Sequence, residues 1–377
     1  MLSCNNTTFK LRDPTRHVRT IFVEESCLDL PYTREILARA NNADIRPIKD
    51  QSQPEFKLPY PHNLNQGKQA LLLCRNRGHF FKPCPGTREY RCCDYQVLNI
   101  GMNCPMDCVY CILQAYLNNP FLSFFVNVED LLAELDLALS RTSQFWRIGT
   151  GEFTDSMALD TLTGLSRILV EYMGDKSTAI LELKTKSAVV DQLKGLSHGG
   201  RTIIAWSLNS GPIMAGEEFR TASLDERLEA AARCASWGYK LAFHFDPIIY
   251  HDGWRQGYKE TINRLFDMVP PEKIVWISMG ALRFLPSLRP IALTRFPKSR
   301  FFHEEFIMGL DGKYRYFRSL RVEMYRHILE CLKRRASPDT CIYLCMESDE
   351  IWRESGFPDG ESTNLPEALD LATQKKS

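Results

Sequence analysis

Three closely spaced cysteines form the segment of this sequence best suited to metal chemistry. Cys104, Cys108 and Cys111 follow the pattern C-x3-C-x2-C in GMNCPMDCVYCILQAYL. Three thiolates in one loop can bind three irons of a four-iron, four-sulfur (4Fe-4S) cubane and leave the fourth iron open for a substrate or cofactor. A structural zinc site normally takes four ligands, so a loop of three leaves zinc short. The spacing therefore predicts a 4Fe-4S cluster.

A regular alternation of strand and helix patterns surrounds this loop. Helices are expected to begin near residues 129, 157, 188, 224 and 255, and strands are expected at 96–101, 145–149, 179–184, 202–208, 240–249 and 273–279. Six strand–helix units in succession predict an α/β protein with a parallel sheet and right-handed crossovers, a partial (β/α)6 TIM-type barrel. The cysteine loop follows the first strand, at the catalytic end of such a barrel. With Tyr110 before the last cysteine, this arrangement resembles the radical S-adenosylmethionine (SAM) superfamily.

Polar residues also follow the next strands of the expected barrel. Gly149, Gly151 and Glu152 resemble the superfamily's glycine-rich motif, in which small residues admit the methionyl part of SAM and a carboxylate pairs with its ammonium. Lys186, after the third strand, offers a cation for the SAM carboxylate, and Ser207, at the end of the fourth, offers a hydroxyl. Each alone is also compatible with a surface turn. Their recurrence at consecutive strand ends favours a binding site.

Longer segments resemble the spore photoproduct lyase family of the radical SAM superfamily. They lie between about residues 80 and 347 and include CPMDCVYCILQAYL, TDSMALDTLTGLSR, LKTKSAVVDQL, WGYKLAFHFDPIIYHDGWRQGY and GKYRY. The resemblance implies a partial TIM barrel that uses SAM and the cluster to make a 5′-deoxyadenosyl radical, which abstracts hydrogen from a thymine dimer lesion in DNA. The implied function is a lyase-like radical SAM reaction on a thymine-type lesion in DNA or another nucleic acid.

Carried over by position, the resemblance also implies roles for single residues. Thr154, Lys186 and Ser207 are expected to contact SAM, with Asp155 beside them. Tyr110 matches a tyrosine that relays hydrogen in the lyase. A segment that resembles the lyase's DNA-binding hairpin supplies four nucleic-acid-binding candidates, Lys313, Tyr314, Arg315 and Tyr316. The resemblance further implies a one-electron donor such as flavodoxin or ferredoxin as a partner.

Two departures from the family pattern affect the chemistry. The lyase's hydrogen-donating cysteine falls by spacing on Glu152, and the O–H bond of a carboxyl group is too strong for that task. The second relay tyrosine of the lyase is Ile112 here. Either another thiol substitutes or the substrate differs, and a radical SAM enzyme that modifies a peptide or small metabolite is the alternative function.

Cysteines upstream of the cluster loop supply candidate thiols. Cys92 and Cys93 are chosen as the catalytic donors, because their loop leads directly into the first strand. Buried free thiols are the simpler interpretation, and a second metal site is a further one. That site would use the upstream set Cys74, Cys84, Cys92 and Cys93. Cys341 and Cys345 are expected to be structural, on a strand with one buried face.

Two side chains of the fifth expected strand also point toward the barrel mouth. His244 and Asp246 share one face of that strand. They are candidates for substrate contact or proton transfer, and the alternative is that they are core residues whose polar groups are hydrogen-bonded.

Composition and charge complete the expectations. The chain has 377 residues, 13 cysteines and a net charge of +1, with no long apolar run and no signal-peptide core at its N-terminus, which predicts a cytoplasmic protein without membrane contact. Residues 283–335 hold 13 Lys/Arg against 5 Asp/Glu, interleaved with aromatic rings. This pattern favours a nucleic-acid surface, with a solvated helix face as the alternative.

The expected domain organisation has four parts. An irregular, cysteine-containing lead-in covers 1–94, and the radical SAM barrel covers 95–282. A basic, aromatic-rich hairpin and helix segment covers 283–346, and a polar, loosely packed tail covers 347–377.

Overall fold

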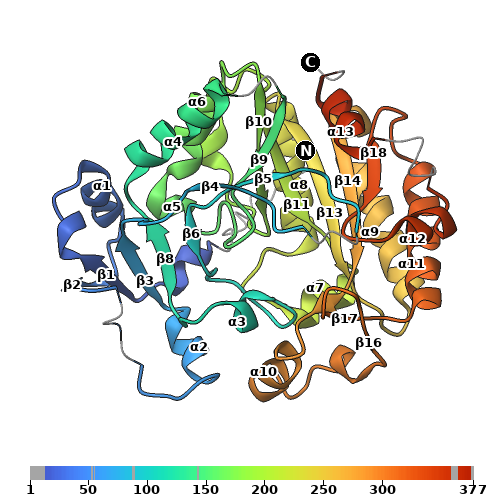
Figure 1. Ribbon diagram of the computed structural model, residues 1–377, viewed down its shortest axis with the longest axis horizontal. Coiled ribbons are helices and arrows are strands. Elements are labelled where there is room, and N and C mark those ends of the chain that lie inside the picture. The colour runs from blue at the N-terminus through green and yellow to red at the C-terminus, as the bar shows by residue number, and fades with distance from the viewer. Residues whose placement is uncertain are drawn as a thin grey trace, which may run out of the picture.

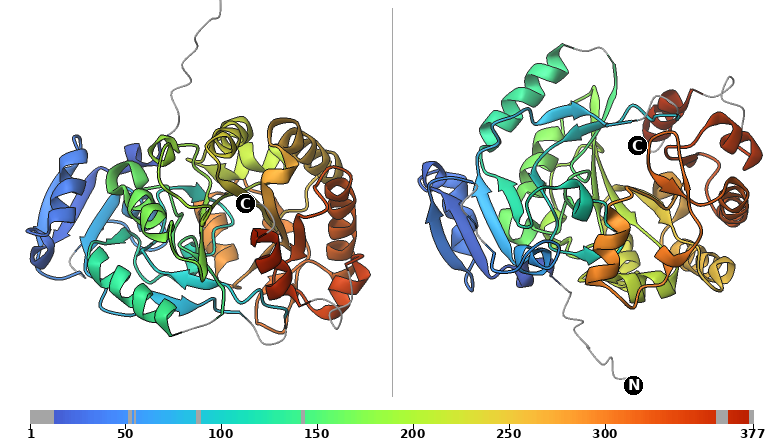
Figure 2. Two further views of the ribbon diagram at one scale, coloured as in Figure 1. Left: turned by 90° about the horizontal axis from the view of Figure 1, so that it is seen from above. Right: turned by 60° about the horizontal axis from the view of Figure 1, so that its bottom comes forward.

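The structure is a computed structural model that describes residues 13–51, 54, 56–86, 90–141, 144–357 and 364–374. An eight-stranded sheet curls into an open half-barrel at its centre (Figure 1). A five-stranded sheet lies at one end of the molecule, and the C-terminal helices lie at the other, as both views of Figure 2 show. Within the described part of the chain, none of the helices combines the length and the apolar character needed to span a membrane.

The eight strands of the half-barrel run parallel, except that β4 pairs antiparallel with β5 at one edge. In sheet order they are β18 (Cys341–Leu344), β14 (Ile274–Ala281), β13 (Lys240–Ile248), β11 (Thr202–Ser207), β10 (Ala179–Thr185), β9 (Trp146–Gly149), β5 (Gln96–Leu98) and β4 (Phe81–Pro83). The six expected strands correspond to β5, β9, β10, β11, β13 and β14. The α/β partial barrel is therefore confirmed.

Burial on both faces explains why these strands have nearly continuous apolar sequences. Every residue of β11 and of β14 is buried. Parallel sheets lose contact with water on both faces, so their strands do not show the alternation of a half-exposed sheet. Glu182, an acid in the middle of β10, is also buried, and such a group requires partners.

Helices connect the parallel strands. They are α4 (Val128–Ser140), α5 (Asp160–Thr163), α6 (Leu165–Met173), α8 (Leu224–Ser236), α9 (Trp254–Met268) and α11 (Arg318–Lys333). The start of α8 has a local sequence signal. The Ser223 hydroxyl accepts from the Glu226 N–H at 3.3 Å, and the Glu226 carboxylate accepts from the Ser223 N–H at 2.7 Å. This capping box satisfies amide groups that the first helical turn leaves free.

The helix expected near residue 188 is wrong. The connection from β10 to β11 contains only a 3-10 turn, Asp191–Leu193. Gly195, Gly199 and Gly200 follow with φ values of 78°, 54° and 68°, in the left-handed region. Glycines in that conformation end helical backbone, so the apolar spacing of this segment cannot extend into a helix.

The lead-in is not irregular, which corrects a second expectation. Its runs TIFVE and ALLLC form β1 (Thr20–Glu24) and β3 (Ala70–Cys74), which pair in parallel. With strands β2 (Asp44–Ile48), β8 (Leu122–Phe125) and β6 (Gly101–Met102) they form a sheet of order β2-β1-β3-β8-β6. Helices α1 (Pro31–Arg39) and α2 (Asn63–Gly67) belong to the same region. Since β6 and β8 come from beyond residue 94, this sheet crosses the expected domain boundary.

The C-terminal region also packs more closely than expected. It contains α10 (Leu288–Arg295), β15 (Arg283–Phe284), β16 (Ile307–Met308), β17 (Tyr314–Arg315), α12 (Asp349–Glu354) and α13 (Leu365–Gln374). Leu365, Leu369 and Ala372 of α13 are buried, and Lys240 of β13 donates to the Thr373 carbonyl at 2.5 Å. The loosely packed tail is therefore wrong for 347–357 and 364–374, and 358–363 and 375–377 lie outside the described residues.

Candidate active site

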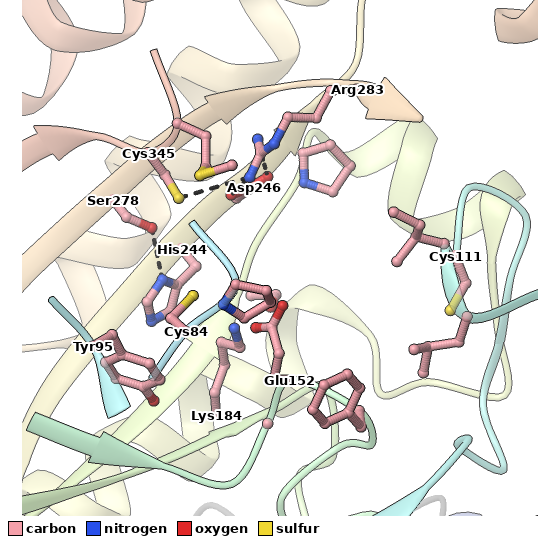
Figure 3. Close-up of a pocket in the computed structure, with 18 of the residues that line it drawn as sticks. Cys84, Tyr95, Cys111, Glu152, Lys184, His244, Asp246, Ser278, Arg283 and Cys345 are labelled. Atoms are coloured by element: carbon pink, nitrogen blue, oxygen red, sulfur yellow. Dashed lines mark hydrogen bonds and ion pairs between the residues drawn. The ribbon is translucent and has the colours of Figure 1, made fainter. Parts of the chain in front are cut away.

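A cavity of about 580 Å³ opens at the carboxyl ends of the barrel strands. The cluster loop forms one side of it, and residues at the ends of β13, β14 and β18 form the opposite wall (Figure 3). Glu152 and Lys184 project between the two sides. This volume lies in the range of small-molecule sites, and the end of the barrel is where enzymes of this architecture carry their chemistry.

All three cysteines of the predicted cluster loop line this cavity. Cys104 and Cys108 are each 8% exposed, and Cys111 is half-buried beside them. The loop is held by a short antiparallel pair of strands, β7 (Asp107–Cys108) with β12 (Glu218–Phe219). Burial, followed by the field of Asp155, raises the pKa of the Cys104 thiol to about 12, so metal binding must displace its proton.

The donor set of this loop fits a cubane cluster. In such a cluster each of three irons takes its own thiolate, so the three sulfurs need not meet at one ion. Within the described residues, no three His, Cys, Asp or Glu side chains lie close enough together to share a single metal ion. Three thiols on one cavity wall are the arrangement that a 4Fe-4S cluster with one open iron requires.

A buried lysine fixes the backbone of the cluster loop. The Lys68 ammonium donates to the carbonyls of Cys104 at 2.9 Å and Met106 at 2.6 Å, and it lies 3.7 Å from the Asp107 carboxylate. Both oxygens of Asp107 also accept from Arg295 at 2.9 Å. Lys68 is 1% exposed, so these charges face one another away from water. No local sequence pattern marks Lys68 as part of the site, because its partners lie far along the chain.

Tyr110 lies on the cavity wall, but its hydroxyl points into a buried ionic network. It donates to the Glu218 carboxylate, which forms an ion pair with Arg227 at 2.6 Å. The Lys186 ammonium lies 5.7 Å from the centre of the Tyr110 ring. The network joins the cluster loop to the ends of β10 and β12.

Most of the residues predicted to bind SAM converge on the same cavity. Besides Lys186, this set comprises Gly151, Glu152, Thr154, Asp155 and Ser207. Gly149 does not line it: a Cβ atom there would lie 1.4 Å from the Tyr95 hydroxyl, so this glycine makes room for Tyr95.

Asp155 accepts hydrogen bonds from several neighbouring backbone and side-chain groups. Its carboxylate accepts from the Lys186 N–H at 2.8 Å, the Thr185 hydroxyl at 2.7 Å and the Ala158 N–H at 2.8 Å. These bonds hold the loop after β9 against the end of β10. Asp155 therefore positions Lys186.

A polar network that sequence analysis did not find forms part of the cavity wall. Glu182 accepts from His244 at 2.8 Å, Tyr95 at 2.6 Å and Trp276 at 3.1 Å. The second ring nitrogen of His244 lies 2.6 Å from the Ser278 hydroxyl (Figure 3). His244 was singled out from the sequence, whereas its carboxylate partner was hidden among the apolar residues of β10.

Glu182 predicts a pH dependence of stability. Burial alone raises the pKa of its carboxyl, but the adjacent His244 and the Tyr95 hydroxyl lower the folded pKa to about 2, below the ordinary 4.5. The unfolded chain therefore binds the proton first, and the stabilisation is present above about pH 4.5 and lost as pH falls toward 2. In urea titrations, the advantage of the wild type over Glu182→Gln should shrink by about 2 kcal/mol between pH 6 and 3. An advantage that stays constant over this range would contradict the assignment.

An ion pair of Arg283 and Asp246 lies in the far corner of the cavity, on the wall opposite the cluster loop. Arg283 donates to both carboxylate oxygens of Asp246, at 3.2 and 3.1 Å, and also to the Cys345 sulfur at 3.7 Å (Figure 3). Asp246 thus faces the cavity as its strand position predicted.

Four thiols outside the cluster loop line the cavity, those of Cys84, Cys92, Cys93 and Cys345. Cys345 corrects an expectation, because it follows β18 at the barrel mouth and faces the cavity. Cys74 is buried at the end of β3 in the other sheet, 1% exposed, and does not line the cavity. The structure does not bring the four upstream cysteines together, so it gives no support to a metal site on Cys74, Cys84, Cys92 and Cys93.

The segment expected to bind nucleic acid forms a hairpin of β16 and β17, but two of its four candidate residues face inward. Tyr316 is fully buried and its hydroxyl accepts from the Tyr250 N–H at 3.1 Å, while Arg315 is 2% exposed and pairs with Asp311 at 2.7 Å. These contacts correct the expectation that both side chains are presented to a nucleic acid. Tyr314 is half-buried, and Lys313 lines the cavity.

The comparison with known families agrees with this geometry. A family model described as spore photoproduct lyase matches residues 17–337. The chain belongs to the spore photoproduct lyase family. The family expected from the cysteine loop and the later segments is therefore confirmed.

Curated relatives and solved structures of this family match most of the chain. Spore photoproduct lyase of Bacillus subtilis (strain 168) is 26% identical over 288 residues, 74% of this chain and 82% of that protein. The same enzyme of Clostridium acetobutylicum is 25% identical over 296 residues, 75% of this chain and 83% of that protein. A solved spore photoproduct lyase complexed with dinucleoside spore photoproduct has a TM-score of 0.77 at 23% identity, covering 87% of this chain and 99% of that chain.

A solved lyase variant with bound AdoMet and dinucleoside spore photoproduct also has a TM-score of 0.77, at 24% identity, and covers 87% of this chain and 98% of that chain. These structures confirm the half-barrel fold. The family match ends before β18, so Cys345 and α13 lie outside it.

Proposed function

We propose that this chain is a radical SAM lyase that acts on a thymine-type lesion in DNA. The observation that carries the proposal is one cavity with three cluster-type thiols on one side and a polar wall on the other, in a chain of the spore photoproduct lyase family. Solved members of the family hold AdoMet and dinucleoside spore photoproduct. When bound here, the cluster and SAM supply a hydrogen-abstracting 5′-deoxyadenosyl radical.

The chain's own residues position the reactants. Cys104, Cys108 and Cys111 hold the cluster, and Lys186 and Ser207 bind SAM at the ends of β10 and β11. The substrate then occupies the remaining space toward the polar network of Glu182 and its neighbours. Tyr110 belongs to the cluster loop and lines this space, and a relay of hydrogen through it requires its hydroxyl to turn away from Glu218.

The proposal has a direct test. Anaerobically reconstituted protein, reduced in the presence of SAM, should convert dinucleoside spore photoproduct to two thymidine units. SAM cleavage without any change in this substrate would instead favour the modification of a peptide or small metabolite, an alternative that Glu152 in the donor position supports.

Lys186→Ala and Ser207→Ala should each weaken SAM binding and leave the iron content unchanged. Each removes a hydrogen bond to SAM, worth about 1–3 kcal/mol, so the dissociation constant should rise by about 5- to 150-fold. Equilibrium dialysis with labelled SAM measures the effect. Wild-type affinity in both variants would place the SAM site elsewhere in the cavity.

Partners follow from the same proposal. Lys313 at the cavity edge is the candidate contact for a DNA phosphate, and binding that uses it should weaken with salt. A flavodoxin or ferredoxin is the proposed electron donor for the cluster. A reducing cytoplasm is the proposed location, since it keeps the cavity thiols reduced.

A further inference from the structure

In the proposed reaction a hydrogen atom is abstracted from the substrate, so a hydrogen atom must later be returned to the product radical. The structure offers a residue that can return it, and this inference rests on the proposed function. Abstraction leaves the substrate as a carbon radical, and after rearrangement the product radical must gain one hydrogen atom. Glu152 is on the cavity wall, but an O–H bond of a carboxyl group is too strong to donate. The S–H bond of a thiol is weak enough, so the four cavity thiols outside the cluster loop are the candidate donors.

Two of these thiols come from opposite edges of the barrel sheet. β4 and β18 are its edge strands, and Cys84 and Cys345 follow them directly. Both cysteines line the cavity, so the curl of the half-barrel brings the two edges to the same space (Figure 3).

The place where the two sheet edges meet, lined by Cys84 and Cys345, is here called the seam. Contacts between the segments that follow β4 and β18 hold it together. The Arg91 N–H donates to the Glu347 carbonyl at 3.1 Å, and the Arg91 guanidinium lies 4.6 Å from the centre of the Trp352 ring. The Arg315 guanidinium lies 4.3 Å from the Tyr90 ring. The upstream cysteine segment is thus packed on the C-terminal segment, and its thiols have defined positions at the cavity.

Cys84 is the cavity thiol that directly follows the edge strand β4. Its N–H donates to the Tyr95 carbonyl at 2.8 Å, and Figure 3 shows its side chain beside the His244 ring, with Lys184 and Glu152 on its other side. Cys345 lies in the far corner, where its sulfur accepts from Arg283 at 3.7 Å. Of the two seam thiols, Cys345 is therefore the one whose sulfur is held by a cation.

Protonation separates Cys84 from Cys92. Burial, followed by the field of Glu152, raises the pKa of Cys84 to about 12, so its S–H bond is intact at neutral pH. The neighbouring Cys93 thiol lowers the pKa of Cys92, which favours the thiolate form that has no hydrogen to give. The interaction with Cys92, followed by burial, raises the pKa of Cys93.

We propose that Cys84 is the hydrogen-atom donor to the product radical. The S–H bond breaks homolytically, the hydrogen atom forms a C–H bond on the product, and a thiyl radical remains on Cys84. One electron from the low-potential donor that reduces the cluster, with one proton from solvent, restores the thiol. Each turnover then consumes one SAM and two electrons, and places one solvent-derived hydrogen in the product.

The experiment compares coupling in matched cysteine variants. Reconstituted wild type, Cys84→Ala, Cys84→Ser, Cys345→Ala and Cys92→Ala/Cys93→Ala are given dinucleoside spore photoproduct in D2O, and thymidine formed per 5′-deoxyadenosine is measured with its deuterium content. Cys331→Ala, a half-buried cysteine of α11 that does not line the cavity, is the control. Iron content and thermal unfolding verify that each variant is folded and loaded.

We expect the ratio of thymidine to 5′-deoxyadenosine to fall about tenfold or more in both Cys84 variants and to stay at the wild-type value in Cys331→Ala. Wild-type product should carry one deuterium. If Cys84→Ala still forms thymidine at the wild-type ratio and with one deuterium, Cys84 is not the donor. The same holds if the ratio falls in Cys345→Ala or in Cys92→Ala/Cys93→Ala instead. Either result would overturn the assignment of Cys84 but leave the proposed function standing. A wild type that cleaves SAM but leaves the lesion unchanged would overturn the proposed function, and the donor with it.

Discussion

Replacement of Cys108 by alanine should abolish the iron–sulfur absorbance of the reconstituted protein and reduce SAM cleavage to background. Cys108 lies in β7, where its backbone pairs with Glu218 of β12, so the loop keeps its shape when the sulfur is removed. Two thiolates remain for an assembly that needs three, and one iron loses its only protein ligand. The loss should exceed the about 10- to 100-fold effect typical of removing an outer partner of a metal ligand.

Anaerobic absorbance spectra, iron and sulfide content, and 5′-deoxyadenosine formation together measure this effect. Cys331→Ala is the matched control, since it removes a thiol that does not line the cavity, and it should keep the wild-type spectrum. Stoichiometric zinc in the wild type with no SAM cleavage, or a full cluster in Cys108→Ala, would refute the cluster assignment.

The parts of the site that sequence analysis predicted are those encoded locally. The cysteine spacing lies within one loop, and Lys186 and Ser207 each follow a recognisable strand. Glu182 was missed because a single acid inside an apolar strand shows nothing of the partners that satisfy it. Cys345 was missed because its place at the cavity depends on the curl of the whole sheet, which brings one edge strand toward the other.

Non-local pairing also explains the lead-in. The runs that form β1 and β3 are separated by more than forty residues, and each is too short to be distinguished from a buried loop segment without its partner. Only the parallel pairing of Thr20–Glu24 with Ala70–Cys74 identifies them as a sheet. Parallel strands require such long connections, so local pattern carries little information about them.

The basic segment shows how a charge count can mislead. Many of its cations are paired with acids from elsewhere in the chain. The pairs include Arg283–Asp246, Arg295–Asp107, Arg318–Glu354, Arg321–Glu347 and Arg335–Asp267. Two of these partners, Glu347 and Glu354, belong to the tail of 347–377, so the tail neutralises part of the charge of the basic segment. The pairs hold the C-terminal region on the barrel, and less free positive charge remains for a nucleic acid than the sequence indicates.

Arg227→Met should destabilise the fold and loosen the cluster loop at the same time. Arg227 and Glu218 are both fully buried, and besides their ion pair Arg227 donates to the carbonyls of Ser207 at 2.8 Å and Ala222 at 2.9 Å. Methionine fills much of the space but leaves the Glu218 charge with only the Tyr110 hydroxyl as a side-chain partner. Breaking a buried pair in this way costs about 3–5 kcal/mol, which denaturant unfolding of the protein should show.

A matched control separates this effect from the loss of a surface charge. Arg264 forms an ion pair with Asp225 in which the side chains are 46% and 66% exposed, so Arg264→Met should cost less than about 1 kcal/mol. Arg227→Met/Glu218→Leu should recover part of the loss, because the isolated charge is gone. Since Glu218 pairs with Cys108 through β12 and β7, Arg227→Met should also retain less iron after gel filtration than Arg264→Met does. Equal stability and equal iron in these two single variants would mean that the buried network does not hold the cluster loop in place.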